Sequence, residues 1–202
     1  MRTERALLPI SRLIEEEAMK RIFIFCLAIV LFSSLAQAKF LIEAKGSYFQ
    51  PSDKNFKQVY NSGKYTEWIS YGGEIGITLG KGVALWAGGS YFNKKGKLTF
   101  TEEETTLQIT PFYGGIKFRS TNSNVSPYLG VGVGYFQYKE ENRINSISKA
   151  DIGYIGQAGL LFRLGVFIVD FQASYSYCKV KPVDVEANLG GFQAGIGLGF
   201  EF

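Results

Sequence analysis

Histidine is absent from this chain of 202 residues. Without an imidazole, the chain can form neither a Ser-His nor a Cys-His nucleophile pair, and no metal can be held by histidine nitrogen. Cysteine is scarce as well, since only Cys26 and Cys178 occur. Cys26 lies in a segment that reads as a removable leader, and its removal leaves Cys178 without a partner for an intramolecular disulfide.

Long apolar runs are also missing, apart from one near the N-terminus. Two basic residues precede the run IFIFCLAIVLFSS, and small residues follow at Ala36 and Ala38. A basic start, an apolar run and an A-x-A site together make up a secretory signal peptide. The run is shorter than the about 20 residues that a membrane-spanning helix needs. The sequence therefore predicts a signal peptide over residues 19–38 and a mature chain from Lys39.

Residues 1–18 precede this signal and are not needed by it. Glu15, Glu16 and Glu17 have purine-rich codons, so this stretch is consistent with a ribosome-binding site that has been translated. On that interpretation Met19 is the true start. A genuine N-terminal extension that begins at Met1 is the alternative.

Charge is nearly balanced from Lys39 onward, where 17 Lys and Arg oppose 14 Asp and Glu. A small and scattered excess of positive charge does not form the basic patch that nucleic-acid binding requires. We therefore expect no nucleic-acid partner.

The segment from Lys39 to Phe202 consists of stretches in which apolar residues alternate with polar or small ones. Such alternation predicts β-strands with two different faces. An even number of antiparallel strands closes into a barrel with both termini at one end. We expect eight strands, over residues 39–50, 65–80, 83–101, 104–119, 126–139, 150–164, 166–181 and 187–202.

The residues on the less apolar face of the strands distinguish a soluble β-sandwich from a membrane β-barrel. In the last strand this face includes Gly195 and Gly197, with a third glycine two residues later. Glycine runs weaken a water-facing strand but suit the crowded interior of a narrow barrel. The apolar face, with Val131, Ala173 and Ile196, is then predicted to face lipid.

The connections between these strands alternate in length. GKG and LG are short, whereas PSDKNFKQVYNSGK and EENRINSIS are long. Short periplasmic turns and long extracellular loops are typical of outer-membrane barrels. Tyrosines gather toward the long loops and phenylalanines toward the short turns, as expected for girdles at two membrane interfaces. Both termini are therefore predicted to lie in the periplasm.

The chain resembles the small eight-stranded outer-membrane proteins of the OmpW and OmpX types, and most of all the outer membrane protein beta-barrel domain group. The resemblance rests on GSYFQPSDKNF, LWAGGSYFNKKGK, SPYLGVGVGYF and the C-terminal GIGLGFEF, and it covers Lys39 to Phe202. It implies an all-β, eight-stranded antiparallel transmembrane barrel in the outer membrane of a Gram-negative-type cell, surrounded by lipid.

The end of the chain resembles the signal by which the barrel-assembly machinery recognises its substrates. The apolar residues of this signal alternate along the last strand. They are Ile196, Leu198, Phe200 and Phe202.

Three function classes remain open. The first is a structural or surface-interaction barrel, for which the charged stretch NKKGKLTFTEEETTLQ offers either a binding patch or merely solvated hairpin charges. The second, implied by the OmpW-type resemblance, is a conduit for small apolar molecules. Six aromatic residues on the lumen face form an upper pocket in that case, or else fill the barrel, because eight strands enclose little free space. They are Phe49, Trp68, Trp86, Phe92, Phe136 and Tyr138.

An enzyme is the third class. Serines are available, but no histidine can activate one, and the carboxylates lie deep in the expected lumen. We therefore expect no catalytic residues, no cofactor and no metal.

The fourth strand departs from clean alternation. Leu107 and Ile109 have odd numbers, whereas the apolar residues Ile116 and Phe118 have even ones. A bulge shifts the alternation by one residue, and proline in a sheet favours bulges. The sequence predicts a bulge over residues 111–114.

Charged residues are expected to plug the lower lumen. If the last strand closes between the seventh and the first, Glu201 lies beside Asp170 on one side and Glu43 on the other. A buried carboxylate needs a cation, and Arg163 is the nearest in this arrangement. The full predicted network consists of Glu43, Glu74, Lys117, Arg119, Arg163, Asp170 and Glu201.

Overall fold

The computed structural model describes residues 38–53, 68–79, 82–97, 104–120, 123–142, 146–181 and 187–202. The expected extension over residues 1–18 lies outside the described residues, as does all of the expected signal peptide but Ala38. No helix long and apolar enough to cross a membrane occurs in the described ranges.

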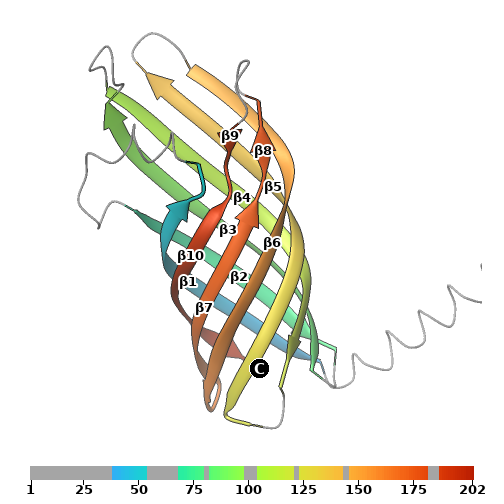
Figure 1. The fold of residues 1–202 in the computed structure, drawn as a ribbon. Coiled ribbons are helices and arrows are strands. Elements are labelled where there is room, and N and C mark those ends of the chain that lie inside the picture. The colour runs from blue at the N-terminus through green and yellow to red at the C-terminus, as the bar shows by residue number, and fades with distance from the viewer. Residues whose placement is uncertain are drawn as a thin grey trace, which may run out of the picture. The chain divides into compact units, whose positions relative to one another are not determined.

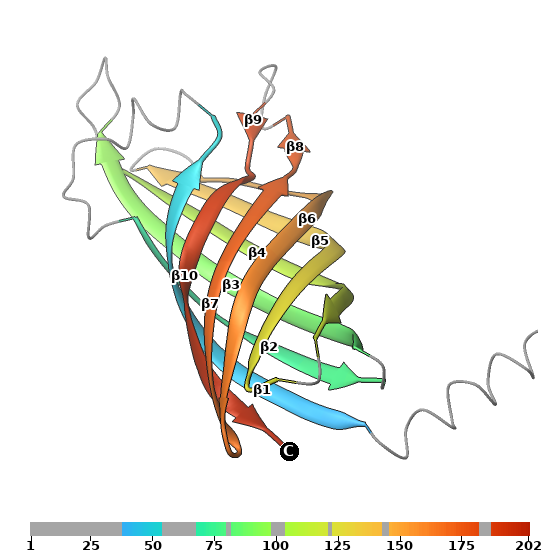
Figure 2. The same cartoon turned by 60° about the horizontal axis from the view of Figure 1, so that its bottom comes forward.

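Eight strands close into an antiparallel barrel in the order β1-β10-β7-β6-β5-β4-β3-β2 (Figure 1 and Figure 2). This arrangement confirms the predicted fold class. The strands are β1 (Lys39–Pro51), β2 (Ile69–Thr78), β3 (Val83–Lys97), β4 (Glu104–Arg119), β5 (Val125–Asn142), β6 (Ser146–Leu164), β7 (Phe167–Tyr177) and β10 (Gly191–Glu201).

The last two predicted strands are each interrupted. Beyond β7 and before β10, β8 (Lys179–Val180) and β9 (Ala187–Asn188) pair with each other in a separate two-stranded sheet. The interruption follows Tyr177, and it places the apolar side chains of this small hairpin over the upper lumen.

The two faces of the wall follow the predicted alternation. In β1, buried and exposed residues alternate from Leu41 to Pro51. Val131 is 62% exposed and Ile196 48% exposed on the outer face, and Ala173 is half-buried there among its alanine neighbours. An apolar outer surface of this size is unfavourable in water and is stabilised by contact with the hydrocarbon chains of lipids.

Closure of the barrel involves the final residue. Phe202 donates its backbone N–H to Phe40 O at 2.9 Å, and Phe40 donates to Phe202 O at 2.7 Å. Their rings stack with centroids 6.3 Å apart. Closing the sheet pairs the backbone groups that an open edge would leave unsatisfied in hydrocarbon.

The strands on one side of the barrel are longer than those on the other side. β3 to β6 contain 15 to 19 residues, whereas β1, β2, β7 and β10 contain 10 to 13. Pairing with β2 ends at Phe92, and pairing with β7 ends at Tyr154. We call the four strand ends beyond these points the raised wall, which Figure 1 shows rising past β1 and β10.

The bulge predicted over residues 111–114 is wrong. β4 pairs with β5 in one unbroken register from Thr105 to Arg119, and its offset from β3 is the same before and after Pro111. Leu107 and Ile109 share the lumen face with the charged residues lower on the strand. The alternation never shifts, because the upper lumen is itself apolar and accepts these two side chains.

Candidate functional site in the barrel lumen

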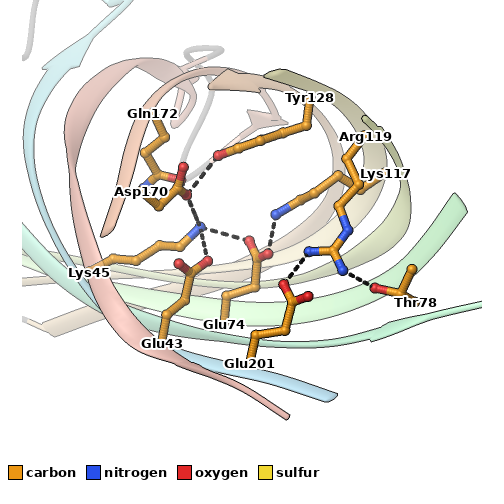
Figure 3. Close-up of polar contacts among 10 residues, drawn as sticks. All are labelled: Glu43, Lys45, Glu74, Thr78, Lys117, Arg119, Tyr128, Asp170, Gln172 and Glu201. Atoms are coloured by element: carbon orange, nitrogen blue, oxygen red, sulfur yellow. Dashed lines mark hydrogen bonds and ion pairs between the residues drawn. The ribbon is translucent and has the colours of Figure 1, made fainter. Parts of the chain in front are cut away.

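A lysine that sequence reasoning missed lies at the centre of the lumen. Lys45 Nζ lies 2.9 Å from Glu43 Oε1, 2.8 Å from Glu74 Oε2 and 3.6 Å from Asp170 Oδ2 (Figure 3). It also donates a hydrogen bond of 2.7 Å to Gln172 Oε1. The signal for Lys45 was present, since the alternation that turns Glu43 inward turns the residue two positions later inward too.

The contacts of this group extend across the barrel. Lys117 pairs with Glu74, and its ammonium lies 4.4 Å from the centre of the Tyr128 ring. Tyr128 donates a 2.7 Å hydrogen bond to Asp170 Oδ2. These side chains come from β1, β2, β4, β5 and β7, so they span the lumen (Figure 3). We call the group Glu43, Lys45, Glu74, Lys117, Tyr128, Asp170 and Gln172 the central charge cluster.

A second group surrounds Glu201 near the turn end of the barrel, and we call it the lower charge cluster. Arg119 Nη1 lies 2.7 Å from Glu201 Oε2, and Arg163 Nε lies 3.3 Å from Oε1. Lys39 Nζ lies 3.7 Å from the same carboxylate, and Arg119 also donates to Thr78 Oγ1. Arg163 donates in addition to Ser126 Oγ at 2.8 Å, which ties it to the start of β5.

The expected neighbourhood of Glu201 with Asp170 and Glu43 is wrong. Glu201 lies opposite Leu41, whereas Asp170 lies opposite Gly197, four residues before Glu201 in β10. Strands of a closed barrel are staggered, so positions counted from strand ends do not lie at one height. The acids therefore divide between two clusters, and Arg163 pairs with Glu201 instead of Asp170.

Buried acidic and basic side chains nearly balance one another over the two clusters. Four buried carboxylates, from Glu43, Glu74, Asp170 and Glu201, meet the inward cations of Lys45, Lys117, Arg119 and Arg163. An unpaired buried charge costs several kcal/mol, so each partner holds the others in place. All seven predicted network residues point into the lumen, and Lys45 joins them.

An apolar group fills the upper lumen, and we call it the upper apolar cluster. The rings of Phe49 and Phe92 meet edge to face at 4.9 Å, and Trp68 stacks on Phe92 at 5.8 Å. Lys94 Nζ lies 4.0 Å from the centre of the Trp68 ring. The buried members are Phe49, Trp68, Phe92, Leu107, Ile109, Phe136, Tyr138, Cys178, Val180 and Leu189.

Cys178 belongs to this packing. Its side chain is buried, and burial raises the pKa of the Cys178 thiol to about 11. A thiol that stays protonated at neutral pH is a weak nucleophile, so the residue acts as a small apolar filler.

Trp86 does not join the other five aromatic residues of the expected upper pocket. Its strand register places it opposite Gly76 and Gly115, well below Trp68. The Trp86 ring lies 5.3 Å from Tyr113 and 5.6 Å from Lys117 Nζ. Its inward direction followed from the alternation, but its depth depends on the stagger between strands.

Glycine makes room for these large side chains where the barrel is narrow. A Cβ atom at Gly159 would lie 2.6 Å from the Tyr128 hydroxyl, and one at Gly132 would lie 3.1 Å from the Trp86 ring. The first distance is too short for any side chain, and at Gly132 a Cβ atom would also lie only 2.5 Å from Gly114 O. The glycine-rich lumen face thus lets Tyr128 and Trp86 cross the interior.

The part of the chain that the structure describes contains no group of three or more Cys, Asp or Glu side chains suited to a metal ion. The acids of the lumen instead face lysine and arginine. Chemically, the arrangement can seal a narrow barrel with charge pairs below and apolar side chains above.

A family model described as "Outer membrane protein beta-barrel domain" matches residues 24–202. No curated protein sequence matches the chain significantly.

Three solved barrels are similar in fold. The N-terminal β-barrel domain of Pseudomonas aeruginosa OprF has 18% identity and a TM-score of 0.51, covering 81% of this chain and 97% of that one. Neisserial surface protein A has 13% identity and a TM-score of 0.57, with 82% and 97% covered. Yersinia pestis Ail, solved with the heparin analogue sucrose octasulfate, has 15% identity and a TM-score of 0.53, with 82% and 99% covered. At such identities the similarity shows the fold alone.

Proposed function

Since the chain belongs to the outer membrane protein beta-barrel domain family, and is thus an outer-membrane barrel embedded in lipid, we propose that it acts as a closed barrel with a structural or surface-interaction role. On this proposal solutes do not pass through the lumen. The chain is also not an enzyme, because it has no histidine to activate a serine and its buried acids are engaged by cations.

The observation that carries the proposal is the presence of two different barriers in series. The central and lower charge clusters fill the lower lumen with side chains that hold one another by charge. The upper apolar cluster fills the upper lumen with rings in contact. Ions are opposed by the apolar barrier and apolar solutes by the charged one.

The conduit for small apolar molecules is less well supported. Its ligand requires free space among Phe49, Trp68 and Phe92, and these rings instead touch one another and are at most 6% exposed. Val180 in β8 and Leu189 directly after β9 belong to the same cluster and further reduce that space.

Single-channel recording in planar bilayers tests the closed barrel. The refolded protein is expected to give no steady current, because both barriers are intact. Removing one ion pair from the central charge cluster, with Lys45→Met and Glu43→Gln, is expected to leave the protein silent, since the upper apolar cluster remains. A steady open pore in the parent protein would overturn the proposal.

Tryptophan fluorescence tests the conduit separately. Trp68 lies within the upper apolar cluster, so a bound apolar molecule would change its emission. We expect no saturable shift when alkanes or fatty alcohols are titrated into the refolded barrel. A saturable shift that disappears in Trp68→Phe, with Trp86 left in place, would favour the conduit instead.

The C-terminal strand is proposed to present the assembly signal. Ile196, Leu198, Phe200 and Phe202 all face outward and are about half exposed or more. An outward apolar ladder at the closing strand supports recognition by the barrel-assembly machinery before closure.

A further inference from the structure

The buried charges balance over the two clusters together, but they do not balance within the central charge cluster. Glu43, Glu74 and Asp170 contribute three carboxylates, whereas Lys45 and Lys117 contribute two ammonium groups. Each of these five side chains is at most 5% exposed. If every group is ionised, one negative charge is left without a partner and away from water, which is strongly unfavourable.

The excess negative charge falls on Glu43 and Asp170. Glu74 is well compensated, because it contacts Lys117 and lies 2.8 Å from Lys45 Nζ. The same Lys45 ammonium lies 2.9 Å from Glu43 Oε1 and 3.6 Å from Asp170 Oδ2 (Figure 3). A single lysine is therefore shared by three carboxylates, two of which have no other ion pair in the described structure.

The strand register brings these two acids together beside a glycine. Gly197 of β10 lies opposite Lys45 on one side and opposite Asp170 on the other. A Cβ atom at Gly197 would lie 2.9 Å from Glu43 Oε2 and 3.3 Å from Asp170 Cβ, so no side chain separates the two acids there. Asp170 Oδ1 is buried and receives no hydrogen bond from the described residues. A buried carboxyl group in such a place is accommodated by neutralisation.

We propose that the central charge cluster binds one proton near neutral pH, shared by Glu43 and Asp170. The proton leaves two negative charges facing two positive ones, with Glu74 ionised between its lysines. The described residues include no group of three or more acids suited to a metal ion, so a proton fits this place better than a metal. Proton binding is a property beyond the closed-barrel role.

Other groups around the pair do not supply the missing charge. The lower charge cluster has cations in excess, but Arg163 there is 13% exposed and donates to Ser123 O at the turn end, where water can solvate it. Phenols and amides are uncharged in this pH range. The residues opposite Asp170 in β10 and β6 are a glycine and a leucine. These neutral neighbours of the cluster are Trp86, Tyr113, Tyr128, Leu161, Gln172 and Gly197.

Proton uptake during folding tests the site, with the full chain carrying no histidine tag. The unfolded acids are ionised at pH 6.5, and no histidine titrates there because the chain contains none. The protein is diluted from urea into weakly buffered lipid vesicles that contain a pH-indicator dye. The parent should take up about one proton per chain more than Asp170→Asn or Glu43→Gln, because each amide balances the charges of the cluster.

Stability should depend on pH for the same reason. The folded barrel holds a proton that the unfolded chain has released, so raising the pH favours unfolding. Between pH 5.5 and pH 6.5 the urea midpoint of the parent should fall by about 0.7 M, the slope for one proton at a usual m-value. The midpoints of Asp170→Asn and Glu43→Gln should stay nearly constant. Combining the two substitutions should give a less stable protein than either alone, since a lysine is then in excess.

Asp151→Asn is the matched control, because it makes the same substitution at an exposed acid in the raised wall. It should keep the proton uptake and the pH slope of the parent. An uptake that persists in both Asp170→Asn and Glu43→Gln would overturn the proposal, as would its loss in Asp151→Asn. So would a parent midpoint that follows sodium concentration instead of pH, since a metal ion would then supply the charge. None of these outcomes depends on whether the lumen conducts ions.

Discussion

Lys45 is the residue whose removal tests the central charge cluster most directly. Its ammonium lies within 2.9 Å of carboxylate oxygens from both Glu43 and Glu74. Replacement by methionine keeps an unbranched side chain one atom shorter and removes the cation that faces Glu43 and Asp170 in the described structure. Glu74 keeps its contact with Lys117.

The expected loss of stability follows from the burial of this pair. Removing one partner of a buried ion pair costs about 3 to 5 kcal/mol, because the remaining charge has no compensation. Solvent screening is small here, since the side chains of Lys45 and Glu43 are 5% and 0% exposed. With a urea m-value of about 2 kcal/mol per molar, the urea midpoint of Lys45→Met should fall by about 2 M.

Urea titration of the protein folded in lipid vesicles provides the measurement, with tryptophan emission as the signal. The double variant Lys45→Met with Glu43→Gln should recover part of the loss, because Glu43 no longer leaves a lone charge. Asp170 has still lost the same cation and keeps its hydrogen bond from Tyr128. Lys95→Met is the control: this lysine is exposed on the outer face, so its midpoint should barely move. A Lys45→Met protein as stable as the parent would refute the reasoning, as would a double variant weaker than the single one.

Three further outcomes are expected. Arg119→Met should lower the urea midpoint more than Arg163→Met, because the Arg119 side chain is 2% exposed and that of Arg163 13%; equal midpoints would contradict this. Val131→Arg should cost about 2 to 4 kcal/mol of folding into bilayers and Gln137→Arg, higher on the same face of β5, about 0 to 1; the reverse order would mean that the assigned depths are wrong. In a Cys178→Ser background, Ser148→Cys should react with an impermeant maleimide on intact cells and Ser123→Cys should not; labelling of Ser123→Cys alone would invert the topology.

The fold was predictable from sequence because a period of two residues carries most of the information about a barrel. Alternation identified the strands, the lipid-facing side of Val131 and Ile196, and the inward direction of Glu43 and Asp170. Even the closing position of the last strand followed, since closure leaves it one place to pair.

Depth inside the lumen was not predictable in the same way. Trp86 and Glu201 point inward as expected, but each lies at a height set by the stagger between strands, which the alternation does not encode. The erroneous bulge near Pro111 had a different cause. It assumed that apolar residues face lipid along the whole of β4, whereas Leu107 and Ile109 face an apolar lumen.

The backbone hydrogen bonds between Phe40 and Phe202 also bear on the order in which the barrel assembles. The second neighbour of β1 is β10, the last strand of the barrel in chain order, so a chain that lacks β10 cannot close. Before β10 pairs with β1, any sheet formed has two unpaired edges, and such edges readily pair with strands of other chains. During export and insertion, β1 must therefore be protected from pairing with other chains until β10 is available to pair with it.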